Sequence, residues 1–97
     1  MGMVDEGRFR GENTLRLFYG ERVRRYPPAL AERTQNKLEI VYAASRLDDL
    51  AVPPGNRLEV LKGDRPGQCS IHIDEQWRIC FRWDGTRSVA IEVVDYH

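Results

Sequence analysis

The sequence predicts an α+β fold in which two N-terminal helices pack on one face of an antiparallel β-sheet. Apolar residues recur every three or four positions in the first half of the chain, which is the period of an amphipathic helix. Three strong helix breakers follow, at Pro53, Pro54 and Gly55. Beyond them apolar and polar residues alternate, which is the period of half-buried strands. At 97 residues the chain is long enough for one domain, expected to span residues 1–97.

Two helices are predicted before the breakers. The first begins at residues 12–14 and ends at Gly20, which is a natural C-terminal stop. The second begins near Pro28, because proline suits the first turn of a helix, and extends to about Leu47. Its apolar stripe, which is expected to lie on a sheet, consists of Leu30, Thr34, Leu38, Val41, Tyr42 and Ser45. For residues 1–11 we expect either a loose N-terminal segment or a short edge strand around residues 8–10.

Four strands are predicted after the breakers, as an antiparallel meander of residues 57–61, 68–73, 77–83 and 88–94. Burial favours the register that pairs Ile71 with Ile79 and Cys69 with Phe81. The same alternation of buried and polar faces argues against a two-residue hairpin loop at Asp84-Gly85. Gly85 is expected to supply a positive φ in this turn. The alternation in the last strand predicts one half-buried face made of Val89, Ile91 and Val93.

This register divides the sheet into two faces. The face that the helices cover carries Cys69, Trp77, Ile79, Phe81 and Trp83. The opposite face, which we call the arginine face, carries Ser70, His72, Arg78, Cys80 and Arg82 and is expected to be open to a ligand. Because Cys69 and Cys80 point to opposite sides, a disulfide between them is implausible.

Composition limits the classes of function. The formal net charge is zero, which argues against a general nucleic-acid coat and restricts any RNA site to a local cluster. No apolar run approaches membrane length and no targeting segment is found, so we expect a cytoplasmic protein that does not enter a membrane. No metal-binding motif is present, His72 is interpreted as a surface residue rather than a ligand, and we expect no metal and no cofactor.

The arginine face and its borders hold the groups that RNA cleavage without a metal requires. That reaction needs a base for the 2′-hydroxyl, cations for the charge that develops on phosphorus, and an acid for the leaving 5′-oxygen. Cations come from Arg78 at mid-strand and from the loop residues Lys62 and Arg65. Glu59 is the candidate base, and the chain end brings Tyr96 and His97.

Each of these residues also has a purely structural interpretation. Arg78 and Arg82 fit a solvated sheet face, and residues 62–65 fit an ordinary charged turn. Glu59 fits a cross-strand ion pair, and residues 95–97 fit a frayed polar tail. The residues alone leave these alternatives open.

Three motifs together resemble the HigB branch of the RelE toxin superfamily, the toxins of type II toxin–antitoxin pairs that are also called plasmid maintenance system killer proteins. The motifs are Leu61-Lys62-Gly63-Asp64-Arg65, Trp77-Arg78-Ile79 and Asp95-Tyr96-His97, in that order and at the spacing of the family. The resemblance covers residues 15–97, and the motifs are specific only in combination.

The resemblance implies a RelE-like fold and an endoribonuclease that cuts mRNA in the ribosomal A site. In such enzymes the 2′-hydroxyl attacks the adjacent phosphate without a metal ion and leaves a 2′,3′-cyclic phosphate. The resemblance also implies a cognate HigA-like helix-turn-helix antitoxin, and contact with operator DNA only through that antitoxin.

Carried over by position, the resemblance implies a basic phosphate-binding loop at Lys62 and Arg65 and a central sheet arginine at Arg78. Several HigB toxins have histidine where this chain has Glu59, whereas glutamate is the general base in the related YoeB branch. The candidate catalytic residues are Glu59, Lys62, Arg78, Asp95, Tyr96 and His97. The candidate RNA-binding residues are Lys62, Arg65, Arg78 and Arg82, of which Arg82 is included for its place on the arginine face and not for the resemblance. The alternative is a non-catalytic RNA- or antitoxin-binding module with the same fold.

Overall fold

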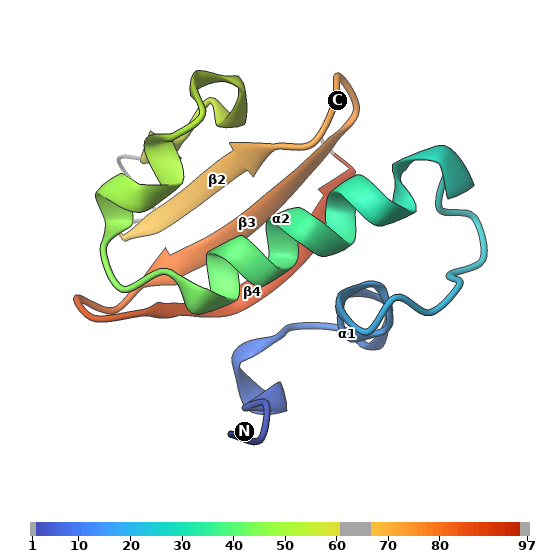
Figure 1. Cartoon of the computed structure of the whole chain (residues 1–97), viewed down its shortest axis with the longest axis horizontal. Coiled ribbons are helices and arrows are strands. Elements are labelled where there is room, and N and C mark those ends of the chain that lie inside the picture. The colour runs from blue at the N-terminus through green and yellow to red at the C-terminus, as the bar shows by residue number, and fades with distance from the viewer. Residues whose placement is uncertain (1, 61–66, 96–97) are drawn as a thin grey trace.

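A computed structural model of the chain describes residues 2–60 and 67–95. Within these residues it contains two α-helices and four β-strands, which confirms the α+β class (Figure 1). The elements are α1 (Glu12–Phe18), α2 (Ala31–Ala43), β1 (Glu59–Val60), β2 (Gln68–His72), β3 (Trp77–Trp83) and β4 (Ser88–Asp95).

Helix α1 agrees with its prediction, but α2 is shorter than the sequence suggested. A 3₁₀ turn at Pro28–Leu30 precedes α2, and the helix ends at Ala43 because Ala44 adopts extended backbone. A separate 3₁₀ turn, Leu47–Ala51, then places Leu50 in the core with no exposed surface. The predicted extension to Leu47 was therefore wrong, because burial of Leu50 redirects the chain before the helical pattern ends.

The strands form one antiparallel sheet in the order β1-β2-β3-β4. The predicted register between β2 and β3 is confirmed, with Cys69 opposite Phe81 and Ile71 opposite Ile79. At the next turn Trp83 pairs with Ser88, so the connection is longer than two residues, as the parity of the faces required. Gly85 has the expected positive φ, +102°.

Strand β4 contains a β-bulge that the alternation of its residues did not reveal. Val89 pairs with Arg82, whereas Glu92 pairs with Cys80, so β4 contains one extra residue between these pairs. Ala90 lies within this segment with φ +52°. Because paired residues share a face, Val89 lies on the arginine face. The prediction that Val89 shares a face with Ile91 and Val93 was therefore wrong, because the bulge shifts the alternation.

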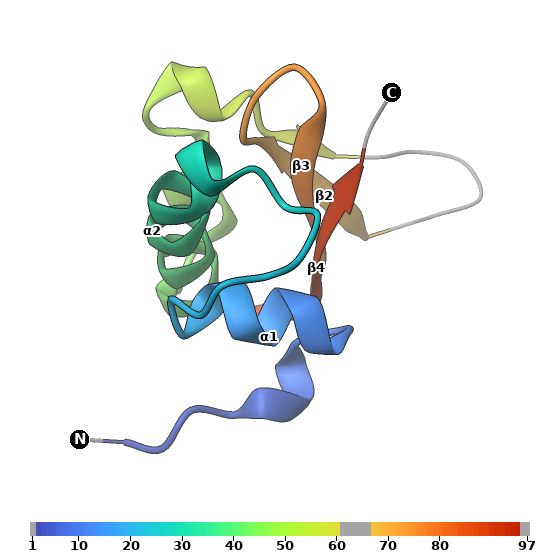
Figure 2. The same cartoon turned by 90° about the vertical axis from the view of Figure 1, so that its right-hand side faces the viewer.

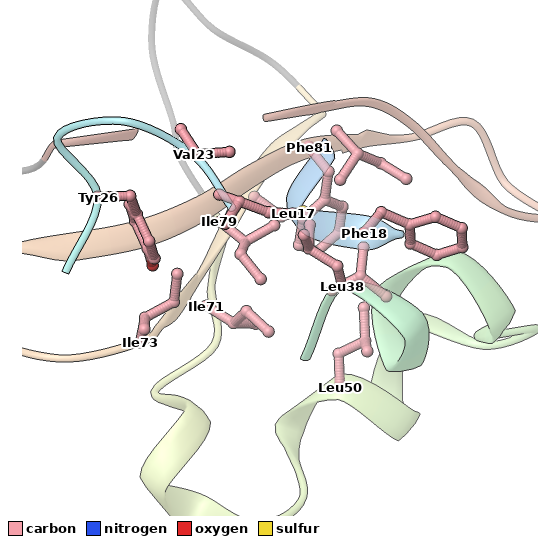
Figure 3. Packing of buried hydrophobic residues seen from close by; sticks show 13 residues of the cluster. Leu17, Phe18, Val23, Tyr26, Leu38, Leu50, Ile71, Ile73, Ile79 and Phe81 are labelled. Atoms are coloured by element: carbon pink, nitrogen blue, oxygen red, sulfur yellow. The ribbon is translucent and has the colours of Figure 1, made fainter. Parts of the chain in front are cut away.

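The core lies between the helices and the sheet (Figure 2). Figure 3 shows how Leu17 and Phe18 from α1, Leu38 from α2 and Leu50 meet the apolar side chains of the strands. Ile71, Ile79, Phe81 and Ile91 are completely buried on that side of the sheet. The predicted division of the sheet into two faces is therefore confirmed for β2 and β3.

The N-terminal segment is tied to the rest of the molecule. Phe9 forms a parallel bridge with Ile91 and stacks on the ring of Tyr42 at 5.5 Å between centroids. The Arg8 side chain is buried and donates hydrogen bonds to the carbonyl of Ser88 (2.8 Å), to its hydroxyl (3.1 Å) and to the carbonyl of Tyr42 (2.9 Å). Of the two predictions for this segment, the edge contact is confirmed and the loose start is wrong for residues 8–10.

Candidate active site

Arg78 lies at the centre of the arginine face, and several contacts hold its side chain in place. Only 8% of the side chain is exposed. Its Nε donates to the hydroxyl of the buried Ser70 at 3.0 Å, and its Nη2 donates to the carbonyl oxygen of Arg57 at 2.9 Å. Arg57 has left-handed backbone, with φ +46°. These contacts fix the guanidinium before any ligand arrives, which is the preorganisation that charge stabilisation requires.

Glu59 is the acidic partner of Arg78. Glu59 is in β1 and pairs with Ser70 in β2, which brings its carboxylate to 3.8 Å from Nη1 of Arg78. About half of its side chain (51%) is exposed, so the contact is long and open to water. Such a pair contributes little to stability, and an incoming phosphate can compete with the carboxylate for the guanidinium.

Arg82 shares the arginine face, but within the described residues its side chain makes no hydrogen bond or ion pair with Arg78. It is exposed and pairs with Gln68 and Val89. Four residues along a strand correspond to roughly 13 Å, so Arg82 lies well away from the Arg78 guanidinium along the same face. Arg82 is therefore better placed to bind another part of an extended polyanion than to bind the phosphate that contacts Arg78.

Asp95 is placed differently from the other described candidates. It ends β4 opposite Trp77, which faces the helices, so its side chain begins on the opposite side of the sheet from Arg78. Its carboxylate accepts a hydrogen bond from Nε2 of Gln76 at 3.2 Å. Glu59 and Arg78 are thus brought together, whereas Asp95 is not brought to them.

Four of the predicted site residues lie outside the described part of the chain. They are Lys62, Arg65, Tyr96 and His97. Their roles stay predictions that rest on the sequence.

His72 is a site candidate that the sequence reasoning did not select. It pairs with Arg78 across β2 and β3, is half-buried, and shares the arginine face. Burial lowers the pKa of its imidazole, and so do the nearby charges of Arg57 and Arg78, against an opposing effect of Glu75. Its Nε2 is buried and has no hydrogen-bond partner within residues 2–60 and 67–95. The sequence did contain a signal for His72, because the predicted register of the two strands already placed it opposite Arg78 on the same face.

The described site can bind an anion and hold a proton acceptor beside it. Arg78 supplies the fixed positive charge, and Glu59 and His72 are the two groups next to it that can accept a proton. Within residues 2–60 and 67–95, no three His, Cys, Asp or Glu side chains gather closely enough to hold a metal ion. No helix in the same described ranges is long and apolar enough to cross a membrane.

A four-stranded antiparallel sheet with two helices and a fixed arginine on its polar face defines a protein compatible with the RelE-like class. A family model described as "RelE-like toxin of type II toxin-antitoxin system HigB" matches residues 8–97. The chain therefore belongs to the HigB-like toxin family, as its motifs suggested. A toxin of a type II system implies a protein antitoxin as its partner.

Two relatives are similar to this chain, and the name of the first agrees with this assignment. Toxin HigB-1 of Vibrio cholerae is 42% identical over 71 residues, which cover 71% of this chain and 75% of the relative. An uncharacterized protein of Haemophilus influenzae is 29% identical over 77 residues, covering 78% of this chain and 76% of the relative.

Proposed function

We propose that this toxin is a ribosome-dependent mRNA endoribonuclease that cleaves by attack of the 2′-hydroxyl on the adjacent phosphate, without a metal ion. The observation that carries the proposal is the fixed guanidinium of Arg78, with a proton acceptor, Glu59, 3.8 Å away. A scissile phosphate bound by Arg78 would replace part of the Glu59 contact and release the carboxylate to accept the 2′-hydroxyl proton.

The remaining roles follow the family motifs. Lys62 and Arg65 would bind the phosphate from the loop, and Arg82 would bind the RNA backbone further along the face. Tyr96 or His97 would donate a proton to the leaving 5′-oxygen, and Asp95 would orient the chain end. The products would be a 2′,3′-cyclic phosphate and a free 5′-hydroxyl. Because the nucleophile is the 2′-hydroxyl of the RNA itself, no covalent bond to the protein would form.

His72 offers a second possible base. An imidazole with a lowered pKa is neutral near pH 7 and able to accept a proton. Binding of a phosphate would add negative charge beside it and favour its protonated form, which assists proton uptake. We assign the base to Glu59 because its carboxylate lies 3.8 Å from Arg78, and we keep His72 as the alternative base.

The proposed partners are a HigA-like helix-turn-helix antitoxin, the ribosome with its mRNA, and operator DNA only through the antitoxin. Cytoplasmic action follows from these partners.

Arg78→Ala is the variant that tests the proposal. We expect induction of the unaltered chain in a bacterial host to arrest growth and to produce new mRNA 5′-ends, and Arg78→Ala to abolish both. Removing a fixed charge that stabilises a transition state lowers rates by about 100-fold or more. Arg46→Ala is the matched control, because Arg46 is exposed and pairs only loosely with Asp48 (3.6 Å).

The outcomes separate cleavage from binding. Growth arrest without new 5′-ends would support the alternative, a non-catalytic RNA- or antitoxin-binding module. Full mRNA cleavage by a folded Arg78→Ala protein would overturn the assignment of the site.

A further inference from the structure

The connection between α1 and α2 borders a groove on the helix side of the sheet. The groove has a volume of about 960 Å³, and its apolar lining includes Leu17, Val23, Tyr26 and Pro27. A smaller hollow of about 210 Å³ shares several of these residues and extends to Trp77 and Val93. Figure 2 shows the connection passing between the helices and the end of β4.

The connection is held firmly in place. Val23 and Tyr26 are both buried, and the amide of Tyr26 donates to the carbonyl of Val23 at 3.2 Å. The Tyr26 hydroxyl is hydrogen-bonded to the hydroxyl of Thr34, and its ring meets Trp77 edge-on at 4.8 Å. Figure 3 shows both anchor residues pointing from the connection toward the sheet. The exposed residues between the anchors are therefore presented on a fixed backbone.

Those exposed residues are Arg24 and Arg25, and a third exposed arginine, Arg22, lies directly before Val23. Arg22, Arg24 and Arg25 all line the groove and are exposed, and none of them forms an ion pair with another described residue. Arg25 has φ +70°, a backbone conformation that few residues other than glycine adopt. Glu21 is the acidic residue that also lines the groove. The rim thus carries a local positive charge, although the whole chain is neutral.

The hollow is lined by Asn13 and Thr14, which can donate and accept hydrogen bonds, and by Arg24, Arg25 and Trp77, which can only donate. Arginine side chains cannot accept a hydrogen bond, and neither can the indole N–H of Trp77. That N–H is buried and has no hydrogen-bond partner among the described residues. A ligand that carries negatively charged acceptors, together with an apolar part for the floor, therefore complements this groove.

We propose that this groove binds an acidic peptide segment of a protein partner, with apolar side chains on the floor and carboxylates against Arg24 and Arg25. RNA fits less well, because Trp77 and Tyr26 are packed against each other and offer no pair of open ring faces for stacked bases. The groove lies on the opposite side of the sheet from Arg78, so this proposal does not depend on the proposed cleavage.

The test uses the full chain and an N-acetylated hexapeptide in which glutamate and leucine alternate. The indole N–H of Trp77 gives its own signal in a ¹H–¹⁵N NMR spectrum, and Trp83 provides an internal control at the far end of β3, about 20 Å away. We expect the peptide to shift the Trp77 signal in a saturable way and to leave the Trp83 signal in place.

Two variants and three other probes decide the outcome. Arg24→Gln combined with Arg25→Gln should weaken binding about fivefold, because each exposed charge pair contributes modestly, and Arg46→Gln should leave binding unchanged. Lysine in place of glutamate in the peptide should abolish binding, and serine in place of leucine should weaken it. A Trp77 signal that the peptide does not move, equal binding by the lysine peptide, or tighter binding of a single-stranded RNA hexamer would each overturn the proposal.

Discussion

At the scale of single residues, the site depends on how Arg78 is held rather than on its presence alone. A surface arginine samples many conformations, whereas this guanidinium is fixed by Ser70 and by the carbonyl of Arg57. Ser70 has no exposed surface, and its small side chain leaves room for the arginine above it. Ser70 is therefore a positioning residue for the proposed reaction.

Ser70→Ala tests this positioning. The change removes the acceptor of the Nε proton, and leaving a buried charged donor without its partner costs about 1–3 kcal/mol of unfolding free energy. Urea unfolding should show this loss, and mRNA cleavage should fall by less than in Arg78→Ala. Ser45→Ala is the control, because Ser45 is exposed. An unchanged unfolding free energy in Ser70→Ala would show that the hydroxyl does not hold Arg78.

The lowered pKa of His72 has a consequence for stability. Its folded pKa lies below the value of about 6.5 that an unfolded chain shows. As pH falls through 6.5, the unfolded chain therefore takes up the proton first, and the folded state loses stability. Chemical unfolding at pH 7.5 and pH 5.5 should show a smaller decrease for His72→Gln than for the unaltered chain. An equal decrease in both proteins would mean that His72 does not cause it.

At the scale of elements, the bulge in β4 determines which residues reach each face. Ser88 pairs with Trp83 and Val93 pairs with Ile79, so Ser88 and Ile91 both face the helices although they are three residues apart. A regular strand does not place two such residues on one face. The extra residue corrects the parity, so that β4 returns to the regular alternation at Val93. Without the bulge, the residues that precede it would present their opposite faces to the core.

Ala90 is the position to test for the bulge. Its φ of +52° is tolerated by alanine, is favourable for glycine, and is strained for a β-branched side chain. We expect Ala90→Val to lower the unfolding free energy by about 1–2 kcal/mol and Ala90→Gly to leave it no lower than in the unaltered chain. Thermal unfolding measures both. If valine were tolerated as well as glycine, the left-handed conformation at this position would be wrong.

At the scale of the whole molecule, Arg8 joins three distant parts of the chain. From the N-terminal segment it reaches Ser88 at the start of β4 and Tyr42 near the end of α2, and its guanidinium carbon lies 4.1 Å from the centroid of the Tyr42 ring. The Ser88 hydroxyl continues the network by donating to the carbonyl of Val41 at 2.7 Å. These contacts connect the N-terminal segment and the start of β4 to α2.

Arg8→Met keeps the apolar stem of the side chain but removes its donors. Since the buried Ser88 carbonyl, the part-buried Tyr42 carbonyl and the Ser88 hydroxyl each lose a hydrogen bond, we expect a loss of about 2 kcal/mol or more in unfolding free energy. Arg10→Met is the matched control, because Arg10 is exposed. Equal unfolding midpoints for the two variants in urea would contradict the structural role of Arg8.

The parts of the fold that could be predicted depend on local repetition. The alternation in residues 68–83 was enough to establish the register of β2 and β3, because a shift by one residue would expose Ile71, Ile79 and Phe81. The same alternation placed Arg78 on the arginine face, although its side chain is more buried than an open face predicts. The pairing of Glu59 with Arg78 was one of several alternatives, and the structure selected it.

The α+β class, the two faces of the central strands and the toxin family can be read from the amino-acid order, since they follow from short periods and contiguous motifs. The end of α2, the bulge at Ala90, the burial of Arg8 and the arginine-lined groove emerge only in the folded chain. Each of these depends on contacts between residues far apart in the chain. Such contacts leave no periodic signal, because the burial of one side chain is determined by the elements that surround it.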